Sequence, residues 1–170
     1  MENRKAQLVP HSPLWKKVFE KESQTLEKLL RKNLVSVHHI GSTAIRSILA
    51  KPTLDIMCIV HTLDGIEMFE DEFRSCGFQS LSGKDTKDRL IFQRTANNGS
   101  DQLTNVYVFE RGNGLINDYL DFRDYLIAEV EVAKSYENLK VTLKKEYPLN
   151  QALYQKGKAE FIQTVLKNIR

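Results

Sequence analysis

The segment HHIGSTAIRSILAKPTLDIMCIV, residues 38–60, holds the residue types and the spacing that could carry out chemistry on a phosphate. A short β-branched run ends at Gly41-Ser42-Thr43, where a Gly-Ser turn leads into a helical segment. The backbone N–H groups of such a turn have no helical partner, and the helix dipole adds partial positive charge, so the turn favours an anion. We therefore predict phosphate contacts from Gly41, Ser42 and Thr43. Ordinary helix capping by the same residues is the alternative.

Asp55 is the second chemical group of this segment. It lies thirteen positions after Ser42, inside the apolar run TLDIMCIV at residues 53–60. A carboxylate in such a run is costly to bury unless it is paired, hydrogen-bonded or bound to a metal. Because Mg²⁺ bridges carboxylate and phosphate oxygens, Asp55 beside a phosphate-binding turn suggests a catalytic acid that also ligates Mg²⁺. A hydrogen bond to a loop or to a neighbouring Arg is the alternative.

Further candidates are basic side chains that can contact phosphate oxygens, with Arg suited to bidentate contacts. They are Lys51, Arg89, Arg94, Arg123 and Lys158. For each of them a solvated or ion-paired side chain is the alternative, and Arg123 lies between Asp121 and Asp124. His39 stands beside the turn and is expected to orient it through a hydrogen bond, not to react.

The elements that must position these residues follow from hydrophobic periodicity and turn residues. Helices are expected at about 13–32, 63–76, 115–129, 131–147 and 151–169, with a short helix at 43–49 that ends before Lys51-Pro52. Strands are expected at 34–40, 53–60, 78–81, 89–95 and 104–110. The chain is thus predicted to be one domain of the α+β class, residues 1–170, with a mixed β-sheet core at about 34–110 and a helical tail at about 115–169.

Length and composition place the chain in the ordinary globular class. Its 170 residues suit one compact domain, and 41% hydrophobic with 28% charged residues is typical of water-soluble proteins. No run approaches a membrane span, and the N-terminal segment lacks the apolar core of a secretory signal, so we expect no membrane contact and a cytoplasmic location. Cys58 and Cys76 have neither metal-ligand nor disulfide spacing and are expected to be small core residues.

The net charge of +3 is unevenly distributed. Residues 1–60 hold ten Lys and Arg against five Asp and Glu, residues 131–170 hold eight against four, and residues 61–130 hold seven against thirteen. Two basic ends suit a polyanionic small ligand or nucleic acid, although solvated helix faces give the same pattern. Nucleic acid is the less favoured partner, because no run of Lys and Arg is interleaved with aromatic residues.

The sequence HIGSTAIRSILAKPTLDI, residues 39–56, resembles the signature of the GrpB family, which reads close to H-I-G-S-T-[AS]-V-P-G-L-x-A-K-P-I-I-D-I. FRDYL at 122–126 resembles the start of that family's helical tail, and its Y-x-x-[AG]-K-x-x-F-I ending resembles Tyr154, Lys158, Phe161 and Ile162. The resemblance implies the nucleotidyltransferase-like superfamily with the DNA-polymerase-β-like fold, in which a Gly-Ser turn precedes a D-x-[DE] pair. It also implies a link to coenzyme A biosynthesis, because the family's domain is sometimes fused to dephospho-CoA kinase.

The chain departs from the superfamily pattern at the positions that hold metal ions. An active nucleotidyltransferase alternates two acids on the strand and adds a third from a neighbouring strand, and together they hold two Mg²⁺ ions. Here Met57 replaces the second acid, and a thioether is a poor ligand for a hard cation. On the later strand Asn105 and Tyr107 share the corresponding face, so Tyr107 is expected to orient a ligand. Glu110, at the end of that strand, is the remaining acid.

Two functions are consistent with these residues. The first is binding of a nucleotide or another phosphorylated small molecule through the Gly-Ser turn and Asp55, with Mg²⁺-dependent transfer of a nucleotidyl group to a small acceptor. The second is a binding module of the same fold that has lost its metal site and does not turn over its ligand. The turn and Asp55 favour the first, whereas Met57 favours the second, so the sequence leaves open whether the chain is an enzyme.

Overall fold

The computed structural model describes residues 7–66, 70–81, 89–95 and 103–170. At their centre is a five-stranded mixed sheet in the order β1-β2-β5-β4-β3. The strands are β1 (Leu34–Ile40), β2 (Thr53–Val60), β3 (Gln79–Ser80), β4 (Leu90–Thr95) and β5 (Leu103–Glu110). β2 and β5 pair in parallel, and the other neighbours pair antiparallel. The predicted α+β class with a mixed sheet is confirmed.

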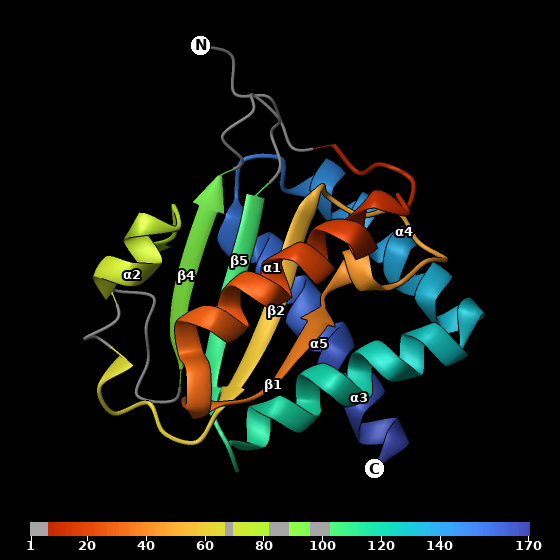
Figure 1. Ribbon diagram of the computed structural model, residues 1–170. Helices are drawn as coiled ribbons and strands as arrows, with labels where there is room; N and C mark the ends of the chain where they lie inside the picture. The colour runs from red at the N-terminus through yellow and green to blue at the C-terminus, as the bar shows by residue number, and fades with distance from the viewer. Residues whose placement is uncertain (1–6, 67–69, 82–88, 96–102) are drawn as a thin grey trace.

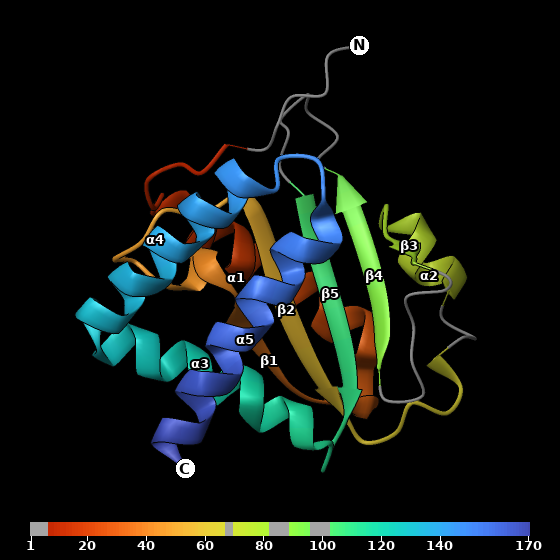
Figure 2. The same ribbon diagram turned by 180° about the vertical axis from the view of Figure 1, so that it is seen from behind.

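Helices cover both faces of this sheet. α1 (Leu14–Leu30) crosses the face that is turned to the viewer in Figure 1. The C-terminal helices lie on the opposite face, where Figure 2 shows α5 in front of the sheet; they are α3 (Gly114–Ala128), α4 (Val130–Glu146) and α5 (Gln151–Ile169). α2 (Glu70–Ser75) lies beside the β3–β4 edge. Within the described ranges, no helix is both long enough and apolar enough to cross a bilayer.

The alternation of side chains along β2 creates the two layers. Leu26 and Leu30 of α1 belong to the same buried cluster as one fully apolar face of β2, made of Leu54, Ile56, Cys58 and Val60. On the opposite face Met57 packs in a second cluster with Ile40, Phe109 and Ile116. Because successive side chains of a strand point to opposite faces, Asp55 points with Met57 toward the helical tail.

A third cluster attaches the segment between β1 and β2 to the tail. In it Ile45 and Ile48 pack with residues of α3, α4 and α5, namely Leu126, Ala133, Tyr136 and Val165. The sequence predicts a short helix at 43–49, and this prediction is wrong: the chain makes one 3₁₀ turn at Ser42–Ala44 and becomes extended at Ile45 (φ −106°, ψ 109°). A helix this short is marginal by itself, whereas the observed path buries both isoleucines against the tail.

The remaining predicted elements agree with the structure to within about two residues, the usual uncertainty of element ends. The helix predicted at 63–76 is the exception. Its first part is a turn closed by the Ile66 N–H bonding the Leu63 carbonyl, and the described helix is α2 at Glu70–Ser75. Residues 67–69 of that prediction lie outside the described ranges.

Candidate functional site

The Gly-Ser turn and Asp55 lie against each other because β1 and β2 are antiparallel neighbours. The register pairs Ile40, the last residue of β1, with Asp55, so the turn begins beside the carboxylate. Gly41 has φ 72° and ψ −174°, a backbone conformation nearly restricted to glycine. A Cβ on Gly41 would lie 2.6 Å from Asp55 Oδ2. Glycine therefore allows the carboxylate to approach the backbone of the turn.

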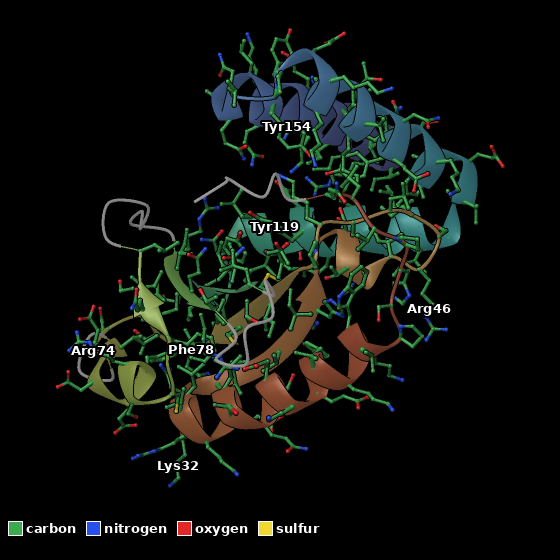
Figure 3. The ribbon with its side chains drawn as sticks, turned by 90° about the horizontal axis from the view of Figure 1, so that it is seen from above. Lys32, Arg46, Arg74, Phe78, Tyr119 and Tyr154 are labelled. Atoms are coloured by element: carbon green, nitrogen blue, oxygen red, sulfur yellow. The ribbon has the colours of Figure 1, made fainter. Side chains whose placement is uncertain are left out.

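This junction opens into a cavity of about 550 Å³ between the sheet and the C-terminal helices. Most of the predicted site residues line it: Gly41, Ser42, Lys51, Asp55, Tyr107, Arg123 and Lys158. Other lining residues were not predicted as site residues, among them Asn105, Asp118, Tyr119, Lys140 and Tyr154. Figure 3 looks down on the molecule and shows Tyr119 on α3 and Tyr154 on α5, with Arg46 pointing outward apart from both.

Arg94 does not belong to this cavity. Its partner on β5 is Thr104, and its side chain points to the α1 face of the sheet, where the guanidinium pairs with Glu22. It also lies 4.5 Å from the centroid of the Phe78 ring and donates to the Cys76 carbonyl at 3.0 Å. The predicted phosphate contact from Arg94 does not agree with this geometry: the residue is a partly buried cation on the other side of the sheet.

His39 and Thr43 hold the turn from the side opposite the cavity. The Thr43 side chain is buried, and its hydroxyl lies 2.9 Å from Nε2 of His39, whose ring stacks on Phe19. Burial and then the charge of Arg123 lower the pKa of His39 to about 4, so the ring is neutral. Thr43 therefore does not line the cavity as predicted. An orienting function for His39 agrees with this geometry and stays a prediction.

Lys140 on α4 lines the cavity and is not among the site residues predicted from the sequence. It is 3% exposed, and its Nζ donates to Ser42 Oγ at 3.1 Å and to the Leu49 carbonyl at 2.7 Å. Burial, and after it the charge of Lys158, lower the pKa of Lys140 to about 8, while Glu137 raises it. A signal was present in the sequence, because a lysine is unexpected among the buried positions of α4, which include Ala133, Tyr136, Lys140 and Leu143.

The same helix fixes the backbone of Leu49 at both of its polar groups. The Glu137 carboxylate accepts the Leu49 N–H, and Lys140 donates to the Leu49 carbonyl. Burial alone would raise the pKa of Glu137, but the Leu49 hydrogen bond and Lys134, which donates at 3.2 Å, together lower it. The segment that follows the Gly-Ser turn is thus held in place by α4.

Two further lysines flank Tyr154 on α5. The Nζ of Lys51 lies 5.0 Å from the centroid of the Tyr154 ring, and the Nζ of Lys158 lies 5.3 Å from it, within the range of cation–π attraction. Lys158 also donates to Gln155 Oε1 at 3.3 Å. Burial lowers the pKa of Lys158, the charge of Asp55 raises it, and Lys51 lowers it again. The two ammonium groups therefore share one aromatic wall of the cavity.

Asp55 is hydrogen-bonded across the parallel β2–β5 pair, where Asn105 Nδ2 donates to its Oδ1 at 2.9 Å. Burial raises the pKa of Asp55 to about 6, although the Asn105 bond and the charge of Lys158 lower it. Burial also raises the pKa of the Tyr107 and Tyr119 phenols, and the Asp55 carboxylate adds to the effect, so both stay protonated. Asp55 is mostly ionised at pH 7 and takes up a proton a little below that.

The donor set beside Asp55 does not fit a pair of divalent ions. In the described part of the chain, no group of three or more His, Cys, Asp or Glu side chains is arranged to hold a metal. Met57, at the next position on this face of β2, is fully buried in apolar contacts. Asn105 turns its amide nitrogen toward Asp55, and its Oδ1 accepts from Gln93 at 2.8 Å. Glu110 lies at the far end of β5. Hard cations take several oxygen ligands, and this arrangement offers few.

The charged lining of the cavity has an excess of positive charge. Its cations are Lys51, Arg123, Lys140 and Lys158, and its acids are Asp55 and Asp118. Asp118 is paired with Arg170 at 2.6 Å, and Arg123 is paired with Asp124 at 2.7 Å. Three ammonium groups therefore line the same cavity as the carboxylate of Asp55, and such a cavity attracts a ligand with several negative charges.

Similarity to known proteins extends over nearly the whole chain. The sequence profile of the family described as GrpB protein matches residues 5–168. The chain belongs to the GrpB family. Among its relatives are Glutamate-rich protein GrpB of Alkalihalophilus pseudofirmus, 33% identical over 95% of this chain and 94% of that protein, and UPF0157 protein YqkA of Bacillus subtilis, 30% identical over 98% of this chain. The chain spans 48% of the length of YqkA.

Solved structures show the fold of this GrpB chain. The conserved protein GrpB from Enterococcus faecalis superposes with a TM-score of 0.77 at 24% identity, covering 94% of this chain and 99% of that one. The poly(U) polymerase Cid1, solved bound to MgATP, superposes with a TM-score of 0.57 at 14% identity, covering 84% of this chain and 46% of that one. The fold is nucleotidyltransferase-like, as the sequence resemblance predicted.

Proposed function

We propose that this GrpB protein binds a phosphorylated small molecule of about nucleotide size in the cavity between the sheet and the C-terminal helices. The observation that supports the proposal is the excess of positive charge in the cavity beside the Gly-Ser turn, which Lys51, Lys140 and Lys158 line together with Asp55, while the second lining acid, Asp118, is paired with Arg170. A polyanion would neutralise this charge, and charge-assisted hydrogen bonds to phosphate are among the stronger polar contacts.

The walls of the cavity suggest the rest of the ligand. Tyr119, Phe122 and Tyr154 present aromatic rings beside a few polar groups, the combination found in small-molecule sites. The volume of about 550 Å³ lies within the range of such sites. Because Cid1, which shares the fold, was solved with MgATP, a nucleotide is the first ligand to test. We add 3′-dephospho-coenzyme A, itself a nucleotide derivative, because the family resemblance implies a link to coenzyme A biosynthesis.

Isothermal titration calorimetry tests the proposal with ATP, GTP, UTP and 3′-dephospho-coenzyme A, each in Mg²⁺ and in EDTA. We expect at least one of them to bind saturably, and Lys158→Gln to weaken binding about tenfold or more, because a hydrogen bond to a charged group contributes about 1.5–3 kcal/mol. Lys156→Gln is the matched control, since Lys156 is exposed on the same helix and does not line the cavity. Failure of every ligand to bind, or equal weakening by both variants, would overturn the proposal.

A second function, nucleotidyl transfer to a small acceptor, is favoured by the position of Asp55 beside the turn. Its pKa of about 6 makes the carboxylate a stronger base than an ordinary aspartate, able to accept the proton of an acceptor hydroxyl. Release of pyrophosphate from ATP in the presence of an acceptor, abolished by Asp55→Asn, would support transfer. Binding without release across a broad acceptor screen would support a binding module that does not turn over its ligand.

A further inference from the structure

We infer that this cavity takes its ligand as a metal-free polyanion, with the ammonium groups of Lys51, Lys140 and Lys158 supplying the positive charge that divalent metal ions supply in active nucleotidyltransferases. This inference rests on the proposed function, because it concerns the same ligand. It specifies the ionic form in which that ligand binds. ATP⁴⁻ would bind well, and its magnesium complex, MgATP²⁻, would bind poorly. Mg²⁺ would then compete with the protein for the phosphates.

The acidic side of the site is already engaged by protein groups. Asp55 Oδ1 accepts the amide of Asn105, and Asp55 Oδ2 lies where a Cβ on Gly41 would be only 2.6 Å away. A hydrated divalent ion on Asp55 would have to share Oδ1 with Asn105 or approach Oδ2 beside the backbone of Gly41, and it would gain one carboxylate in return. Met57, which stands where a second acid would be needed, is 0% exposed and cannot turn into the cavity without leaving its apolar cluster.

The basic side supplies donors that bind phosphate and repel metal. An ammonium group has three N–H donors and no acceptor, so it cannot ligate a cation. Lys140 uses two donors on Ser42 and Leu49, which leaves one for a ligand oxygen. Lys51 and Lys158 lie 5.0 Å and 5.3 Å from the same Tyr154 ring, so two like charges share one wall. A dication would add to this repulsion, whereas a polyanion would relieve it.

Titration calorimetry in EDTA and in excess Mg²⁺ tests the inference, with ATP and inorganic tripolyphosphate as probes. We expect the Kd of both probes to be at least tenfold lower in EDTA than in Mg²⁺. Mg²⁺ neutralises two negative charges of the ligand, and the loss of one charge-assisted hydrogen bond to the protein raises the Kd tenfold or more. Lys158→Gln should reduce this advantage of EDTA, and the control Lys156→Gln should leave it unchanged. Tripolyphosphate isolates the contribution of the phosphates from that of the base and sugar.

The outcomes separate the inference from the proposed function. Binding that requires Mg²⁺, or that has the same Kd in both buffers, would overturn the inference and leave the proposed function standing. Absence of binding by every probe in both buffers would overturn both. Mn²⁺ titration followed by electron paramagnetic resonance gives a readout without any ligand. We expect no Mn²⁺ site with a Kd below about 1 mM, the weak end for protein-bound divalent ions; a tighter site that Asp55→Asn abolishes would contradict the inference.

Discussion

Replacing Gly41 with alanine tests the close approach of the Gly-Ser turn to Asp55. Two penalties are expected. Holding a non-glycine residue at φ 72° and ψ −174° costs about 1–3 kcal/mol. The new Cβ would also lie 2.6 Å from Asp55 Oδ2 and 3.2 Å from Asp55 Cβ, so the carboxylate must rotate away from Asn105. Losing that hydrogen bond to a charged group costs about 1.5–3 kcal/mol.

The two penalties together should lower the free energy of unfolding by about 2.5–6 kcal/mol, which corresponds to a fall in Tm of roughly 10 °C for a chain of this size. Urea unfolding and differential scanning calorimetry measure both quantities. Gly112→Ala is the matched control, because Gly112 also has a positive φ of 86° but a Cβ there would meet nothing within 4 Å. The Gly112→Ala variant should show the backbone strain alone, about 1–3 kcal/mol.

A double variant isolates the contact itself. Asp55→Ala removes the oxygen that the Gly41→Ala methyl would strike, so the two changes together should destabilise less than the sum of the single changes. Equal destabilisation by Gly41→Ala and Gly112→Ala, or strict additivity of Gly41→Ala with Asp55→Ala, would refute the reasoning.

Three further predictions follow from the charged groups. Because the folded state holds the Asp55 proton up to a pKa of about 6, above its unfolded value, the unfolding free energy should fall as pH rises from about 4 to 6, and Asp55→Asn should remove this dependence in urea titrations. Affinity for tripolyphosphate should fall as pH rises through 6, where Asp55 gains its negative charge. The affinity should fall again above about pH 8, where Lys140, which lies near Lys51, Lys158 and Glu137, loses its proton. Calorimetry at constant ionic strength measures both changes, and an affinity that stays constant from pH 5 to 9 would contradict them. Arg94→Met should lower the free energy of unfolding by roughly 3 kcal/mol, because it leaves the buried Glu22 carboxylate unpaired. The same variant should leave the affinity for tripolyphosphate unchanged. A loss of affinity with no loss of stability would show that Arg94 belongs to the binding site.

The sequence was sufficient to predict the positions of the strands and the placing of Asp55 beside the turn. Strict alternation along residues 53–60 separates an apolar face from the face that carries Asp55, and one short connection brings the turn back beside it. These are local patterns, because each depends on residues close together in the chain. For the same reason the helical tail was predicted to within about two residues, since its helices have regular apolar spacing.

Lys140 and Arg94 show where such prediction stops. Lys140 bonds Ser42 across nearly a hundred positions of sequence, and only the packing of α4 against the turn brings the two together. Nothing in the sequence distinguishes Arg94 from the other predicted phosphate-binding cations. The β4–β5 register places its side chain on the α1 face, where it pairs with Glu22. Both errors arise from the placement of side chains that are distant in sequence, which local periodicity does not specify.

The walls of the cavity include two stretches that are far apart in the chain, the turn and strand at residues 41–55 and residues 140–158 of α4 and α5. A ligand that contacts both stretches can bind only while α5 is docked on the sheet, so binding and docking form one linked equilibrium. Opening of the tail then becomes less favourable by RT ln(1 + [L]/Kd). Amide hydrogen exchange should therefore slow in both stretches together when the ligand is added, and the ligand acts as a reversible cross-link between the sheet and the tail.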